Sequence, residues 1–228
     1  MPDAPTADAV EHRAGPSRLQ HQFDDAEQQR QTASLGMWIF LATEVMFFGG
    51  LFASYMIYRV WYPTIFGAAS RQLDIVLGAT NTTVLITSSL TMAMAVHSAA
   101  TGRRNLLLVF LALTMVLGLV FLGIKAYEYD QKFVEHLVPG PGFEFPGASP
   151  ERAQIFFSLY FAMTGLHALH MVVGVGLLAV MFIMAWRGAF SPEWHNPIEN
   201  SGLYWHFVDI IWIFLFPLLY LVDRHAGQ

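Results

Sequence analysis

Five long apolar stretches constrain this chain more than any other feature of its sequence. About 20 apolar residues in a helix are needed to cross the hydrocarbon core of a bilayer, which is roughly 30 Å thick. The stretches that meet this length are residues 35–58, 75–98, 106–127, 153–186 and 202–222. Soluble proteins contain buried apolar helices, but five in succession at this length are typical of a membrane protein. The sequence therefore predicts an all-α integral membrane bundle of five transmembrane helices over residues 35–228.

The charged residues lie mostly outside these stretches and exclude several classes of protein. Only 13% of the 228 residues are charged, against about 25% in ordinary soluble domains. Twelve Lys and Arg face seventeen Asp and Glu, and a net negative charge argues against a nucleic-acid-binding protein. The absence of cysteine excludes a disulfide framework and a Cys-ligated metal centre. Residues 1–34 are polar and rich in acids, and we expect them to form a soluble tail.

The charged residues next to the spans do not determine the orientation of the chain in the membrane. Five spans place the two ends of the chain on opposite sides, and Lys and Arg are shared equally between the two sides. The positive-inside rule, applied to total charge, therefore favours neither orientation. Arg103 and Arg104 stand together in the short loop after the second span. This pair weakly favours a cytoplasmic position for that loop and for the N-terminus.

Glu44 is an ionisable residue deep inside the first span. It lies about nine residues into the stretch, which corresponds to roughly 13 Å along a helix. A carboxyl group there is costly unless it is paired or holds its proton, so it needs an explanation. One interpretation is a neutral acid that donates a hydrogen bond to a neighbouring helix. The other is a group that exchanges or buffers protons, and the residues alone leave both open.

Histidines and further acids mark the ends and the interiors of the later spans. His167 and His170 share one helix face at spacing i, i+3, and so do His206 and Asp209. His97 closes the second span and Glu128 closes the third. Three interpretations remain open: a metal site, a bis-histidine haem site, or an interhelical hydrogen-bond network that fixes packing or holds lipid head groups. A di-iron cluster would need more carboxylates than these helices carry.

Several motifs in fixed order resemble a known family. They are LGMWIFLATEVMFFGGLF, NTTVLITSSLTMAMAVHSA, YEY, YFAMTGLHALHMVVG and a run that starts at Glu199, reaches His206 after six residues and ends in YWHFVDIIWIFLF. Together they resemble subunit III of the haem–copper respiratory oxidases, in the cytochrome c oxidase branch. The resemblance covers residues 35–221. The longer form of the family has seven transmembrane helices, and five helices match the shorter bacterial form.

The resemblance implies an accessory chain of a respiratory complex. Such a subunit carries no haem, copper or other metal, and it has no catalytic residue of its own. It packs directly on subunit I, beside subunit II and other oxidase subunits, and it binds phospholipid. The complex passes electrons from cytochrome c to oxygen and pumps protons, and subunit III supports proton uptake and turnover stability. The implied location is the bacterial cytoplasmic (inner) membrane, with the N-terminus cytoplasmic, the C-terminus periplasmic and no nucleic acid bound.

The resemblance also assigns expectations to individual residues. Glu44 matches the membrane-buried glutamate of the family and is the proton-related candidate. The other polar positions are expected to bind lipid or to join helices, and none is expected to be a metal ligand. They are His97, Glu128, His167, His170, Arg187, Glu199, His206 and Asp209.

Other functions remain to be distinguished. The equivalent subunit of a quinol oxidase or of a nitric oxide reductase assembly would share the fold and much of the motif pattern. A stand-alone proton-coupled transporter would use Glu44 and the histidines as a relay, although no inverted repeat is evident. An integral membrane metalloenzyme would use the histidine cluster. Co-purifying subunits and the visible spectrum would separate these alternatives.

Overall fold

The computed structural model describes residues 22–146 and 149–222, and within them every regular element is a helix. Five of these helices are long and apolar enough to cross a membrane, which confirms the predicted all-α membrane architecture. The first 21 residues of the predicted tail lie outside the described residues. The helices are α2 (Ala26–Trp61), α3 (Pro63–Ser70), α4 (Ile75–Ala100), α5 (Arg104–Val134), α6 (Pro150–Trp186) and α7 (Asn196–Tyr220).

Each spanning helix extends past the apolar stretch that predicted it, at one end or at both. Helix α2 begins at Ala26, nine residues before the predicted span. The Asp25 carboxylate accepts a hydrogen bond of 2.6 Å from the backbone N–H of Gln28, as an N-cap residue does. Helix α5 continues to Val134 because polar residues of its last turns are buried. Apolarity therefore located the spans, and capping and side-chain pairing set their ends.

Residues 22–39 form a compact unit of their own that holds the start of α2. An exposed ion pair of 2.9 Å joins Arg30 and Glu27 at spacing i, i+3 on this part of the helix. Leu35, Trp38 and Ile39 are all more than half exposed. A polar first turn followed by exposed apolar side chains is the pattern of a helix that passes from water into lipid.

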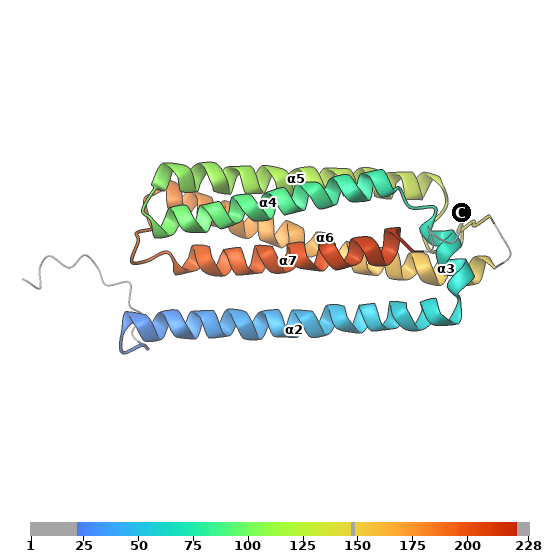
Figure 1. Cartoon of the computed structure of the whole chain (residues 1–228), viewed down its shortest axis with the longest axis horizontal. Helices are drawn as coiled ribbons and strands as arrows, with labels where there is room; N and C mark the ends of the chain where they lie inside the picture. Colours follow the sequence, from blue (N-terminus) through green and yellow to red (C-terminus); the bar gives the residue numbers. More distant parts are fainter. Residues whose placement is uncertain (1–21, 147–148, 223–228) are drawn as a thin grey trace, which may run out of the picture. The chain divides into compact units, whose positions relative to one another are not determined.

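Residues 40–222 form the second unit, whose centre is a bundle of four helices. Helix α4 packs against α5 and α7, and α6 packs against the same two helices, so that each helix has two neighbours (Figure 1). The short helix α3 lies against α6. Tight turns connect α4 to α5 and close the end of α6, where Gly102 and Gly188 adopt positive φ values of 70° and 74°. These conformations strain any side chain, so glycine suits both positions.

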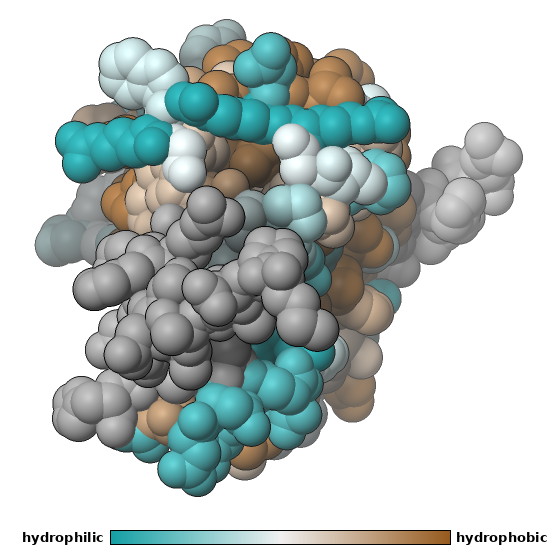
Figure 2. All heavy atoms as spheres, turned by 90° about the vertical axis from the view of Figure 1, so that its left-hand side faces the viewer, coloured by the Kyte–Doolittle hydropathy of each residue, from teal (hydrophilic) through white to brown (hydrophobic). Residues whose placement is uncertain are grey.

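The surface of this unit divides as a membrane protein requires. Large apolar side chains on α4, α5, α6 and α7 are about half exposed, which is tolerated where the solvent is lipid. Hydrophilic side chains gather at the end of the bundle that carries the α4–α5 turn, and hydrophobic ones lie behind them (Figure 2). The hydrophilic end marks the water-facing boundary of the bundle.

The last turn of α7 is held by side chains from α2 and α3. Tyr55 donates its hydroxyl hydrogen to the carbonyl of Leu218 at 2.8 Å, and Ser70 donates to the carbonyl of Leu219 at 2.7 Å. Both hydroxyl-bearing residues are fully buried. The final carbonyls of a helix have no partner inside the helix. These two hydrogen bonds therefore satisfy the end of α7 without water and connect it to the segments that precede α4.

Candidate functional site

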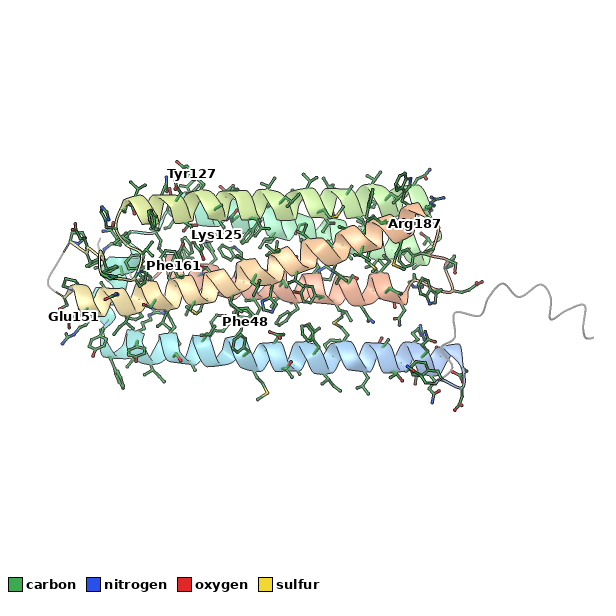
Figure 3. The ribbon with its side chains drawn as sticks, turned by 180° about the vertical axis from the view of Figure 1, so that it is seen from behind. Phe48, Lys125, Tyr127, Glu151, Phe161 and Arg187 are labelled. Atoms are coloured by element: carbon green, nitrogen blue, oxygen red, sulfur yellow. The ribbon has the colours of Figure 1, made fainter. Side chains whose placement is uncertain are left out.

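A buried ion pair lies near the α3 end of the bundle. Lys125 and Glu128 are one helical turn apart on α5, and their Nζ and Oε2 atoms are 3.0 Å apart. Lys125 is 2% exposed and Glu128 is 0% exposed. Figure 3 shows Lys125 pointing from α5 into the bundle, whereas Tyr127 points away from it. A buried pair of this kind is stable only when further hydrogen bonds satisfy both charges.

Two tyrosines complete the hydrogen bonding of this pair. The Lys125 ammonium donates to the hydroxyl oxygens of Tyr160 (3.1 Å) and Tyr220 (3.0 Å). Both hydroxyls in turn donate to Oε1 of Glu128, at 2.9 Å from Tyr160 and 2.6 Å from Tyr220. All three ammonium hydrogens are used, and the carboxylate accepts three hydrogen bonds. The cluster therefore joins α5, α6 and α7 through hydrogen bonds among its own four side chains.

Aromatic rings surround the Lys125 ammonium. Its Nζ lies 5.0 to 5.7 Å from the centroids of four rings, which belong to Tyr129, Tyr160, Trp212 and Tyr220. Cation–π attraction within about 6 Å is strongest where water is excluded. Lys125, Tyr160 and Tyr220 are not among the positions predicted from the sequence. The available signal was the Lys-x-x-Glu spacing at the end of an apolar span, which places opposite charges on one helix face.

A second polar pair joins α2 to α6. Nε2 of His170 lies 3.2 Å from Oε2 of Glu44, and the two side chains are 13% and 19% exposed. Nδ1 of His170 lies 2.9 Å from the carbonyl oxygen of Leu166. Because a carbonyl only accepts, Nδ1 carries a hydrogen. One further proton lies between Glu44 and His170, either on the carboxyl as a neutral pair or on the ring as an ion pair.

Aromatic side chains enclose this proton-sharing pair. The Phe48 ring lies 5.4 Å from the His170 ring and 6.4 Å from the Phe207 ring. Tyr204 donates its hydroxyl hydrogen to the backbone carbonyl of His170 at 3.0 Å. The geometry is compatible with both interpretations of Glu44, since its carboxyl group bridges α2 to α6 and also contacts a second ionisable side chain.

His167 has different surroundings from His170, although one helical turn separates them. It is 1% exposed, and its ring lies 5.3 Å from the Phe121 ring and 5.1 Å from the Trp212 ring. Neither ring nitrogen has a hydrogen-bond partner within the described segments. His167 therefore lies in an aromatic part of the core, apart from the contact that His170 makes with Glu44.

The hydroxyl-rich helix α4 bonds to its neighbours at several levels. Trp205 and Trp212 of α7 donate their indole N–H groups to Ser88 and Thr82, both at 3.1 Å. The hydroxyls of Thr91 on α4 and Thr114 on α5 are 2.8 Å apart. Such bonds replace the water that a polar side chain lacks inside a membrane. The hydroxyls thus hold α4 against both of its neighbours in the bundle.

His206 and Asp209 line a pocket between α4 and α7. Nδ1 of His206 lies 2.7 Å from the Ser89 hydroxyl. Asp209 is 3% exposed, and its carboxyl group interacts with the same Ser89 hydroxyl. The pocket has a volume of about 290 Å³ and is otherwise lined by aliphatic side chains. His206 of α7 thus contacts α4 through Ser89.

The remaining predicted positions lie apart from these clusters. Glu199 accepts a hydrogen bond from His195 at 3.1 Å, one turn earlier in the chain. His97 and Arg187 lie near the ends of α4 and α6, and both are exposed. Over residues 22–146 and 149–222, no three His, Asp or Glu side chains come together as metal ligands would. The metalloenzyme alternative therefore gains no support from the arrangement of the described side chains.

Comparison with known proteins identifies the family to which this chain belongs. The family model described as cytochrome c oxidase subunit III matches residues 20–223. Cytochrome c oxidase subunit 3 of Thermostichus vulcanus is 31% identical over 206 residues, covering 88% of this chain and 92% of the relative. The equivalent protein of Synechocystis sp. is 34% identical over 195 residues, covering 82% and 74%. Cytochrome bo(3) ubiquinol oxidase subunit 3 of Pseudomonas aeruginosa is 27% identical over 218 residues, covering 95% and 98%.

The matches extend over nearly the whole chain and include all five membrane-spanning helices. They agree with the resemblance drawn from the motifs around Glu44, His170 and His206. The chain belongs to the cytochrome c oxidase subunit III family, the third subunit of the haem–copper oxidases.

Proposed function

We propose that this chain is the non-catalytic subunit III of a proton-pumping cytochrome c oxidase in the bacterial inner membrane. It packs directly on subunit I, beside subunit II, with the N-terminus in the cytoplasm. The haem and copper centres lie in partner subunits. The observation that carries the proposal is the family match over residues 20–223. It is supported by buried polar groups that bond mainly to each other, as at Lys125 and Glu128, rather than opening onto a reaction site.

A quinol oxidase is the second candidate, because relatives of both kinds match this chain. The relative in Pseudomonas aeruginosa is a ubiquinol oxidase subunit, and a further one in Staphylococcus haemolyticus, 29% identical, is a probable quinol oxidase subunit. The cytochrome c relatives are slightly more similar, at 31% and 34% identity. The proposal of cytochrome c as the electron donor therefore rests on this small difference in sequence identity, because the donor is bound by other subunits.

Purification of the chain from its native membrane in mild detergent tests the proposal. We expect two larger subunits and a haem a spectrum to accompany it, and reduced cytochrome c to support oxygen consumption. Oxygen consumption with quinol alone would replace the proposal by the quinol oxidase candidate. A colourless chain that purifies by itself would contradict both and would favour the transporter alternative.

Bound phospholipid belongs to the same proposal and is supported by basic residues at one end of the bundle. Arg103 and Arg187 are exposed there. Arg104 donates to the carbonyls of Ala185 and Trp186, which fixes the α4–α5 turn against the end of α6. Exposed arginines beside an apolar surface suit the phosphate of an anionic lipid head group. On this proposal His97, at the end of α4, lies at the same membrane boundary.

Glu44→Gln is expected to leave assembly intact and to alter the kinetics of proton uptake. The glutamine amide can donate to Nε2 of neutral His170, so the contact between α2 and α6 persists, but an amide releases no proton. Proton uptake by the purified complex, followed with a pH-indicator dye over repeated turnovers, measures the effect.

Glu44→Leu serves as the matched variant because it removes the hydrogen bond as well. It is expected to destabilise the contact by about 1 kcal/mol, the net value of one hydrogen bond. Unchanged proton uptake and unchanged inactivation during turnover in Glu44→Gln would limit Glu44 to a structural role.

A further inference from the structure

The Ser89 hydroxyl differs from the other hydroxyls of α4. Most of them donate their hydrogen to a carbonyl oxygen of their own helix, as do Thr82, Thr83, Thr87, Ser88, Thr91 and Ser98. The Ser89 hydroxyl oxygen instead lies 2.7 Å from Nδ1 of His206 and also interacts with the carboxyl group of Asp209. One hydroxyl of α4 therefore connects an acid and a base of α7. We refer to Ser89, His206 and Asp209 as the α4–α7 cluster.

The α4–α7 cluster lies at mid-membrane depth, where a net charge is costly. Asp209 lies about 20 Å along α7 from its first residue and about 16 Å from its last. Within the described segments, neither Asp209 nor His206 pairs with a charged side chain. The ionisable groups of the other helices bond elsewhere, in the pairs Lys125–Glu128 and Glu44–His170. The cluster is therefore favoured to hold the number of protons that leaves it without net charge.

Three transferable protons make the cluster neutral, and they can be arranged in two ways. In the first, Asp209 is a carboxylic acid that donates to Ser89, Ser89 donates to Nδ1 of His206, and Nε2 carries the third proton. In the second, Asp209 is a carboxylate that accepts from Ser89, and Ser89 accepts from an imidazolium. Two proton shifts interconvert them, one from Asp209 to Ser89 and one from Ser89 to His206. The first avoids separated charges inside the membrane and is the resting arrangement.

The pocket between α4 and α7 gives this chain of hydrogen bonds one open end. Both carboxyl oxygens of Asp209 are buried, whereas Nε2 of His206 is not. The pocket has a volume of about 290 Å³, which is room for several water molecules at about 30 Å³ each. Its other lining side chains are aliphatic and carry no proton. A proton therefore enters or leaves the cluster at His206.

We propose that the α4–α7 cluster is a proton relay, in which Asp209 stores a proton that is loaded and unloaded through Ser89 and His206. In unloading, the two protons shift toward His206 and Nε2 gives its proton to a water molecule in the pocket. The products are an Asp209 carboxylate, bonded to the Ser89 hydrogen, and a neutral His206 protonated on Nδ1. Loading is the reverse. The relay is a second proton-holding site, formed by other helices than the Glu44–His170 pair, and it does not depend on which electron donor the complex uses.

Infrared spectroscopy of the purified complex tests whether Asp209 stores a proton. The carbonyl stretch of a protonated carboxyl group is separate from the bands of carboxylates and amides. We expect the difference spectrum between the unmodified complex and Asp209→Asn at neutral pH to contain one such band, and the band to move to lower frequency in D₂O. Equal spectra in this region would mean that Asp209 is ionised, and the proposal would fail.

Ser89→Ala assigns the same band without changing the acid. It removes the acceptor of the Asp209 proton, so the carbonyl stretch is expected to move to higher frequency. Thr87→Val is the matched control, because the Thr87 hydroxyl lies on the same helix but bonds to the carbonyl of Thr83. This variant should leave the band in place. A band that moves equally in both variants, or in neither, would contradict the bond between Asp209 and Ser89.

The rate of deuterium exchange tests the route of the proton. After a switch from H₂O to D₂O, the shift of the Asp209 band is followed in time. We expect Ser89→Ala and His206→Phe each to slow the exchange about 100-fold, the lower end of what a positioned proton-transfer group contributes, and Thr87→Val to leave it unchanged. Exchange at the unmodified rate in Ser89→Ala or in His206→Phe would show that the proton reaches Asp209 by another route, and the relay would be refuted.

Discussion

Glu128→Ala is expected to destabilise the bundle by about 3–5 kcal/mol, because it leaves a buried ammonium group without its counter-ion. Lys125 is 2% exposed and donates to Glu128 at 3.0 Å. The hydroxyls of Tyr160 and Tyr220 would lose their acceptor at the same time. The effect can be measured as the midpoint temperature at which this chain is lost from the detergent-solubilised complex. We expect a clear fall in that temperature.

Two further variants separate the buried charge from other causes. Glu135→Ala removes a carboxylate that also pairs with a lysine at spacing i, i+3 on α5, at 2.6 Å from Lys132. The Glu135 side chain is 48% exposed, and the buried Lys132 keeps the carbonyl of Gln72 as an acceptor. We therefore expect the loss to be only about 0–1 kcal/mol. Combining Glu128→Gln with Lys125→Met removes both charges and keeps an acceptor for the tyrosines. The double variant should recover most of the loss.

The comparison of these variants decides between two explanations of the cluster. If Glu128→Ala and Glu135→Ala lower the dissociation temperature equally, burial of the Lys125–Glu128 pair does not add to its contribution to stability. If the double variant is as unstable as Glu128→Ala, the loss comes from packing and not from an uncompensated charge. The network assigned to Lys125, Glu128, Tyr160 and Tyr220 would then not be what stabilises this end of the bundle.

The five spans could be predicted from the sequence because lipid selects for apolar length alone. Each helix needs about 20 apolar residues whatever its neighbours are, so residues 75–98 and 153–186 located α4 and α6 to within a few residues. The ends were less predictable. Helix α5 runs to Val134 through polar residues such as Lys132, which is 3% exposed and donates to the carbonyl of Gln72 at 2.7 Å. Hydropathy alone does not reveal such a partner.

The polar residues are easier to find in the sequence than to pair. Glu44 and His170 each stand out as ionisable groups in apolar stretches, yet 126 positions separate them, and their contact depends on how α2 and α6 are rotated. Lys125 does not stand out because it lies near the predicted end of a span, where lysine is usually a membrane-surface residue. His167 and His170 share a spacing that suggests one site, but one faces the core and the other faces α2.

Trp205→Ala is expected to be about as damaging as the loss of Glu128, at about 3–5 kcal/mol, the usual cost of removing a large buried aromatic side chain. The Trp205 indole is fully buried and reaches three other helices. An added Cβ at Gly118 of α5 would lie 2.7 Å from this indole, and one at Gly174 of α6 would lie 3.1 Å from it. Its N–H donates to Ser88 of α4 at 3.1 Å. One side chain of α7 therefore fixes the spacing of all four helices.

Because Gly118 and Gly174 leave room for the Trp205 indole, we expect the loss of stability only when this tryptophan is replaced. Trp186→Ala, on the exposed face of α6 where the side chain is 67% exposed, serves as the matched control and should have little effect on the same dissociation temperature. Trp205→Phe keeps part of the ring between Gly118 and Gly174 but cannot donate to Ser88, so an intermediate loss is expected.

Gly118→Ala should destabilise the bundle in the presence of Trp205 and much less in the Trp205→Phe background, because the smaller ring leaves room for the methyl group. If Gly118→Ala is equally harmful in both backgrounds, the indole is not what requires glycine at that position, and the role of Trp205 as the spacer of the four-helix core would have to be abandoned.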